Sequence, residues 1–374
     1  MKGNHGIMMK SKVALSLAGL ILLGCTSTPT TSTEKVGPQK KSLATIVYQS
    51  NRGSALEPCG CEYKPWGGID REANAVEGYR KTQPHLWYVD AGNLYARTDT
   101  KVTHDYVVSK AAAITQMLNT MKLDLFAPGP LDYSMGMESL KQMAAKAQFK
   151  FISSNVLGKN GKSVFLPYHI EKRGELNFAF LSLSPDMTFK EEGYQVEAAE
   201  QTLARLLPEL SVKADFVVLL TQLDNAQTQA IGEKYPEIRV IVGASTKVVT
   251  DKPYWFKTGK TLLVDPDNFG MVLGKLTIEY RTPFQGFYSP VAIMDNQDEL
   301  KLLEAGLAKD PKKKESIEAI EKFKQYRLLA AMPGGSPYGG ELIKLDKNRF
   351  GAKNAITQLI AKQKEDVRNQ AIKH

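Results

Sequence analysis

The feature that most constrains the fold of this chain is an alternation of short apolar runs with amphipathic helical patterns. Several of the runs are almost continuously apolar, as is typical of strands covered on both faces of a sheet. Between them, apolar residues recur at three- and four-residue spacing, as at Ala111, Ile114 and Leu118. This order predicts an α/β layered fold. The predicted strands are residues 43–49, 86–91, 123–127, 149–153, 176–183, 216–221, 238–243, 261–264 and 273–280.

The pattern changes after residue 281. Residues 295–330 and 352–372 are charged and have helical spacing, and the Gly/Pro-rich stretch 332–340 separates them. We therefore predict a main domain over residues 43–281 and a short helical C-terminal region over residues 282–374.

The N-terminus has the pattern of an export signal. Lys2, Lys10 and Lys12 precede the apolar run 13–23, and no acidic residue occurs before Cys25. The run is too short to span a bilayer, which needs about 20 residues. Residues 1–24 are therefore predicted to be a secretory signal peptide and not a transmembrane helix.

The end of this signal resembles the lipobox of bacterial lipoproteins, in the residues Leu22-Leu23-Gly24-Cys25. The resemblance implies that the Cys25 thiol carries diacylglycerol and that its new amine is acylated, as by palmitate. Residues 25–42 would then be the lipidated cysteine and a flexible Thr/Ser/Pro-rich tether. Thr26, which is not an Asp, favours the outer membrane over the inner one. The alternative is an ordinary cleaved signal with an incidental cysteine.

Composition argues against nucleic acid as a partner, and the predicted lipid anchor makes the membrane a partner. The net charge is +9, but no arginine-rich stripe or stacking-aromatic motif points to nucleic acid. No second hydrophobic segment reaches membrane-spanning length. The predicted partners are thus the membrane, through the lipid anchor, and an unidentified envelope protein or small ligand.

Several ordered segments together carry a family resemblance. They are Thr45-Ile46-Val47-Tyr48, Leu56-Glu57-Pro58-Cys59-Gly60-Cys61, Gly67-Gly68-Ile69 with Arg71, Val89-Asp90-Ala91-Gly92-Asn93-Leu94, Ala127-Pro128-Gly129, Ser153-Ser154-Asn155-Val156, Leu219-Leu220-Thr221-Gln222-Leu223, Ile241-Val242-Gly243 and the final turn at Gly270 and Gly274. In these segments the chain resembles the N-terminal metallophosphatase domain of the 5′-nucleotidase and UDP-sugar hydrolase group, within the calcineurin-like phosphoesterases. The resemblance implies a layered β-sandwich flanked by helices.

That family holds two metal ions with Asp, His and Asn side chains at the ends of its strands, and the pair activates water. The matching positions here hold other residues: Asn51, Gly53, Asn93, Pro130, Leu131, Gln222 and Gly243-Ala244-Ser245-Thr246-Lys247. Neutral amides supply no anionic oxygen, and Pro130 and Leu131 supply no ligand atom. We therefore predict no metal at the family site and no catalytic residue there. Asn51, Asn93, Asp132, Asn155 and Gln222 would line a vestigial cleft, although Asp132 also fits a turn or helix cap and Asn155 a turn.

Cys59 and Cys61 are the remaining chemical feature. If Cys25 is lipidated, they are the other two of the three cysteines in the chain. Three interpretations stay open: a structural disulfide, a redox-active pair whose strained ring is easily reduced, and a clamp for a single soft metal such as copper(I). No other cofactor is predicted.

The leading hypothesis from sequence is a pseudoenzyme, an envelope lipoprotein whose phosphoesterase-like domain works as a non-catalytic binding or interaction module. The first alternative is a thiol-redox or metal-clamp lipoprotein that uses Cys59 and Cys61. The second alternative is a residual phosphoester hydrolase of the 5′-nucleotidase type. Fold alone does not decide among them.

Overall fold

The computed structural model describes residues 40–60, 65–97, 102–243, 254–255, 259–266, 269–295 and 297–372. Gln39–His374 form one compact unit. The predicted signal peptide, the lipidation site Cys25 and most of the tether lie outside the described residues, as does Cys61. Among the residues that are described, no helix is long and apolar enough to cross a membrane.

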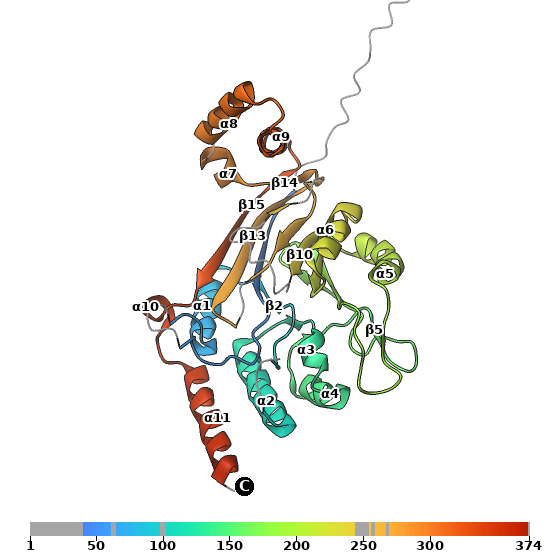
Figure 1. Cartoon of the computed structure of the whole chain (residues 1–374), viewed down its shortest axis with the longest axis vertical. Coiled ribbons are helices and arrows are strands. Elements are labelled where there is room, and N and C mark those ends of the chain that lie inside the picture. Colours follow the sequence, from blue (N-terminus) through green and yellow to red (C-terminus); the bar gives the residue numbers. More distant parts are fainter. Residues whose placement is uncertain are drawn as a thin grey trace, which may run out of the picture. The chain divides into compact units, whose positions relative to one another are not determined.

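Two large sheets form the centre of the fold (Figure 1). The first has the strand order β14-β15-β13-β1-β2-β3-β4, and the second has the order β11-β12-β10-β9-β7-β6. In the first sheet the bounds are β1 (Lys40–Gln49), β2 (Trp87–Asp90), β3 (Leu125–Phe126), β4 (Lys150–Phe151), β13 (Val272–Thr282), β14 (Gly286–Tyr288) and β15 (Gly335–Lys344). In the second they are β6 (Tyr168–Arg173), β7 (Leu176–Leu183), β9 (Phe216–Thr221), β10 (Ile238–Gly243), β11 (Tyr254–Trp255) and β12 (Leu262–Val264). A small third sheet pairs β5 (Val156–Leu157) with β8 (Gln195–Val196).

The two large sheets share an apolar core. Ile46 and Trp87 from the first sheet pack in one buried cluster with Phe178 and Phe180 from the second. The rings of Trp87 and Phe180 have centroids 4.5 Å apart. Because side chains alternate along a strand, Val47 faces the opposite side of β1 and joins a different core. The structure thus confirms a layered sandwich.

Helices cover the outer faces. On the first sheet lie α1 (Ile69–Thr82), α2 (His104–Met121), the short α3 (Pro130–Tyr133), α4 (Met137–Lys146) and α11 (Ala355–Ile372). On the second lie α5 (Ala199–Lys213) and α6 (Asn225–Lys234). Helix α11 packs beside α1 and α2 (Figure 1). Its buried Ile356 and Ile360 belong to the same core cluster as Ile114 of α2.

All the strands expected from sequence are present, but the region after residue 281 is not only helical. It contains α7 (Pro290–Asp295), α8 (Gln297–Lys309), α9 (Lys314–Ala331), α10 (Lys347–Phe350) and α11, together with β14 and β15. We expected the Gly/Pro-rich stretch 332–340 to connect two helical segments. From Gly335 onward this prediction is wrong, because the chain there forms β15, which pairs with both β13 and β14. Close packing explains one glycine there: a Cβ on Gly335 would lie 1.7 Å from the carbonyl oxygen of Leu329. Strands β5, β6, β8 and β11 were also not predicted from the sequence.

Candidate functional site

The loops after β1, β2 and β3 meet at one edge of the first sheet, because these three strands are parallel neighbours. The amide N–H of Asn51 donates to the Gly92 carbonyl (2.8 Å), and that of Gly53 donates to the Asn93 carbonyl (2.9 Å). Asn51 and Asn93 have φ of 50° and 56°, in the left-handed region that asparagine tolerates better than most residues. The two asparagines therefore lie side by side at the strand-end edge where we expected them from the sequence.

The two asparagine side chains bind each other. Asn93 Nδ2 donates to Asn51 Oδ1 at 2.9 Å, and Asn93 Oδ1 accepts from the Leu131 amide at 3.1 Å. Asn51 and Asn93 are only 5% and 7% exposed. Their amides therefore connect three loops.

Asp132 binds the backbone of Asn93 and is fully buried. Its Oδ2 accepts from the backbone N–H groups of Asn93 (2.7 Å) and Gly129 (2.8 Å). Its Oδ1 accepts from those of Leu94 (2.9 Å) and Tyr95 (2.8 Å). Burial raises the pKa of Asp132 to about 6, while the four N–H groups act in the opposite direction. Asp132 therefore holds the backbone of these loops together. We call Asn51, Asn93 and Asp132 the Asn51–Asn93 cluster.

The other two predicted cleft residues occupy different places. Gln222, which follows β9 of the second sheet, donates from Nε2 to the Ala127 carbonyl at 3.3 Å. It lies against the backbone beside the cluster, since a Cβ on Gly92 would meet Gln222 Nε2 at 2.3 Å. Asn155 instead exchanges two bonds with Ser184, through Ser184 O (2.8 Å) and Ser184 N (2.9 Å). It therefore joins loops of the two sheets.

A buried charge network lies next to the cluster, and sequence reasoning missed it. Arg52 and Glu72, 1% and 0% exposed, form an ion pair. Glu72 also accepts from the Tyr88 hydroxyl and from Gln49 Nε2 (3.2 Å). The signal in the sequence was an arginine three residues after the end of an apolar strand, where a buried cation needs a partner.

Asp90, at the end of β2, belongs to the same region. Its carboxylate accepts from the Gly92 amide at 2.8 Å. Burial raises its pKa well above the usual range, and the Gly92 hydrogen bond and the Arg52 charge oppose that shift. The Arg52 guanidinium therefore places a positive charge beside the carboxyl groups of Glu72 and Asp90.

The polar side chains described at this edge are already bonded within the protein. Within the described part of the chain, no group of three or more His, Cys, Asp or Glu side chains is placed to hold a metal ion. The Asp132 carboxylate already accepts four N–H bonds, and the asparagine oxygens accept bonds within the protein. Residues 244–247, which match the family's last ligands, lie outside the described residues.

Cys59 lies in the loop between β1 and α1. Its amide N–H donates to the Trp66 carbonyl at 2.9 Å, and Pro58 forms an isolated bridge with Gly67. The two ends of the loop that contains Cys61 are therefore held together. Since Cys61 is not described, the choice among disulfide, redox pair and metal clamp remains a prediction.

Two packed sheets with helices on both sides, and polar loops at the strand ends, are the architecture of calcineurin-like metallophosphoesterases of the 5′-nucleotidase type. Comparisons with known proteins agree. The chain is 27% identical over 193 residues to the uncharacterized metallophosphoesterase YunD of Bacillus subtilis, which covers 50% of this chain and 41% of YunD. It is 23% identical over 270 residues to human 5′-nucleotidase, covering 63% of this chain and 46% of that protein.

Solved structures show the same fold. The 5′-nucleotidase precursor from Thermus thermophilus matches with a TM-score of 0.65 at 16% identity, over 88% of this chain and 59% of that one. No family model matches the chain. The chain spans less than half the length of the two curated relatives, 41% and 46%. It has the metallophosphoesterase fold, and its activity is a separate question.

Proposed function

We propose that this chain is an envelope lipoprotein whose 5′-nucleotidase-like domain is a binding module that does not hydrolyse phosphate esters. One observation carries the proposal: Asn51 and Asn93, which match the family's metal positions, are bonded to the protein itself. They bind each other, and the neighbouring Asp132, which matches no ligand position, binds four backbone N–H groups. The fold is that of the family, while these polar side chains stabilise the loops of the protein.

The chemistry supports this interpretation. A dinuclear site needs anionic oxygens and imidazoles around two cations. To ligate a metal, Asp132 would have to release buried N–H groups, and each unsatisfied group costs about 1–3 kcal/mol. Arg52 already supplies a positive charge to the carboxyl groups of Glu72 and Asp90.

The envelope part of the proposal rests on the N-terminal sequence. Leu22-Leu23-Gly24-Cys25 would be processed to a lipid-bearing Cys25, with residues 26–42 as a tether. Several acyl chains on one residue anchor a protein stably, since each buried methylene contributes about 0.8 kcal/mol. Thr26 favours the outer membrane.

We expect the purified full chain to hydrolyse 5′-AMP no faster than buffer when Mn²⁺ is present. The reason is that no set of side chains in the described residues is placed to hold the ions that would activate water. Release of inorganic phosphate measures the rate, and a protein preparation treated with chelator is the matched blank. Mn²⁺-dependent hydrolysis that chelation abolishes would instead support the residual-hydrolase alternative.

A second candidate is thiol-redox function at Cys59 and Cys61. The bridge between Pro58 and Gly67 supports it, because it closes the loop that carries both cysteines. We expect the pair to change from disulfide to two thiols within the potential range of a glutathione buffer series. Thiol alkylation and mass measurement follow the change, with Cys59→Ser as the control. A pair that stays in one state throughout the series rules out redox cycling.

A further inference from the structure

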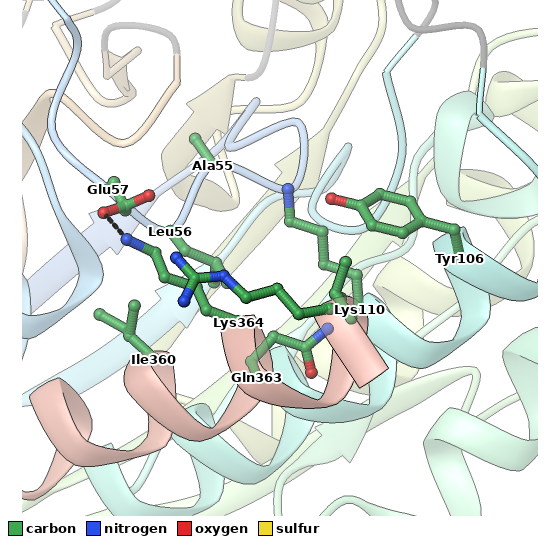
Figure 2. A pocket seen from close by; sticks show the side chains of 10 residues that line it. Ala55, Leu56, Glu57, Tyr106, Lys110, Ile360, Gln363 and Lys364 are labelled. Carbon is green, nitrogen blue, oxygen red and sulfur yellow. Dashed lines mark hydrogen bonds and ion pairs between the residues drawn. The ribbon is translucent and has the colours of Figure 1, made fainter. Parts of the chain in front are cut away.

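A cavity of about 490 Å³ lies between the loop after β1, helix α2 and helix α11. Figure 2 shows the side chains that line it. They combine apolar groups, such as Leu56 and Ile360, with three cations, Lys110, Lys364 and Arg368. The cavity size is within the range of small-molecule sites.

The charges in this cavity are unequal. Among the described lining residues, Glu57 is the only one with an acidic side chain, and it pairs with Lys364 at 2.5 Å. Three cations and one carboxylate leave two positive charges in excess, on Lys110 and Arg368. Concave sites lined by one sign of charge concentrate ligands of the opposite sign.

Lys110 is the more informative of these two cations. Burial lowers its pKa, the nearby Arg97 charge lowers it further, and Glu57 acts in the opposite direction. Within the described part of the chain its ammonium makes no hydrogen bond or ion pair, and it lies 5.8 Å from the centre of the Tyr106 ring. A smaller cavity of about 130 Å³, lined by Arg97 among others, adjoins it at Lys110 and Tyr106. A bound anion would offset this unbalanced positive charge.

Gln363 on α11 supplies an independent observation. It lines the cavity and is 7% exposed. Its amide nitrogen is buried and has no hydrogen-bond acceptor among the described residues. Buried donors are rarely left unpaired in folded proteins, and such exceptions point to a missing partner.

We propose that this cavity binds a small organic dianion with an apolar body, either a phosphate monoester or a dicarboxylate. Lys110 and Arg368 would bind the charged groups, and Leu56 with Ile360 would contact the apolar part. Gln363 would donate to one charged group once its buried amide turns toward the cavity. The inference does not depend on the state of the Asn51–Asn93 cluster, because none of these residues belongs to that cluster.

The test measures binding of 1-naphthyl phosphate and of naphthalene-2,6-dicarboxylate to the full chain by calorimetry. Neutral 1-naphthol is the uncharged comparison. A blank that contains detergent but no protein corrects for the heat that the detergent contributes. We expect saturable binding of at least one dianion that weakens as salt is added. Arg368→Gln, an exposed change that leaves the core intact, should weaken it about fivefold, and Lys110→Gln by roughly tenfold or more.

Lys353→Gln is the matched control, since Lys353 is exposed, precedes α11 and does not line the cavity. It should leave the affinity unchanged. If only 1-naphthyl phosphate binds, the site takes phosphate monoesters. If only naphthalene-2,6-dicarboxylate binds, it takes dicarboxylates. Equal binding of neutral 1-naphthol, or equal loss in the Lys353 and Arg368 variants, would overturn the proposal.

Discussion

Replacing Asp132 by alanine lowers the free energy of unfolding by about 3–5 kcal/mol in our account. The carboxylate accepts the N–H groups of residues 93, 94, 95 and 129, and the side chain is fully buried. Alanine leaves these donors without an acceptor and opens a polar void. Urea unfolding followed by circular dichroism measures the change through the transition midpoint.

Asp224→Ala is the matched control for this substitution. Asp224 is exposed and its side chain accepts one backbone N–H, that of Gln227, as the N-cap of α6. Loss of such a cap costs about 1 kcal/mol. If Asp132→Ala costs no more than Asp224→Ala, the four recorded hydrogen bonds do not hold the loops together, and the role assigned to Asp132 is wrong.

Arg52→Met is expected to cost about 3–5 kcal/mol, because it leaves the carboxylate of Glu72 buried without its cation. The Tyr88 hydroxyl and Gln49 still donate to Glu72, but neither supplies a positive charge. The same denaturation experiment measures the loss. An exposed pair provides the comparison: Lys81→Met, which removes the contact of Lys81 with Glu77, should cost less than about 0.5 kcal/mol.

A double-mutant cycle separates the charge effect from lost packing. Glu72→Gln removes the negative charge and keeps an oxygen that accepts from Tyr88. The double variant with Arg52→Met should therefore be more stable than Arg52→Met alone, by roughly 1–2 kcal/mol. Simple addition of the two single losses would contradict a coupled buried pair.

The strands were predictable from sequence because most of them are covered on both faces and consist of apolar runs. β9 (Phe216–Thr221) is buried at every position, and the sequence shows it directly. β15 was missed because its sequence contains Gly335, Pro337, Gly339 and Gly340, which are typical of a turn. Its strand conformation depends on pairing with β13 and β14, contacts that local sequence does not encode.

The candidate site was predictable in position but not in detail. The resemblance placed Asn51 and Asn93 at the ends of two strands, and the parallel pairing of β1 with β2 in the structure brings their loops together. The Arg52–Glu72 pair was not found, because the two residues lie on different elements and their contact depends on how α1 packs. Likewise, Lys364 meets Glu57 across 307 positions of sequence.

The most direct test of the central claim is to count the Mn²⁺ ions that bind to the purified full chain in the samples used for the 5′-AMP assay. Equilibrium dialysis with elemental analysis gives the number of ions per chain. Our account predicts no stoichiometric binding, because the side chains of the Asn51–Asn93 cluster already bind the protein itself. Two ions per chain, together with 5′-AMP hydrolysis that chelation abolishes, would contradict it.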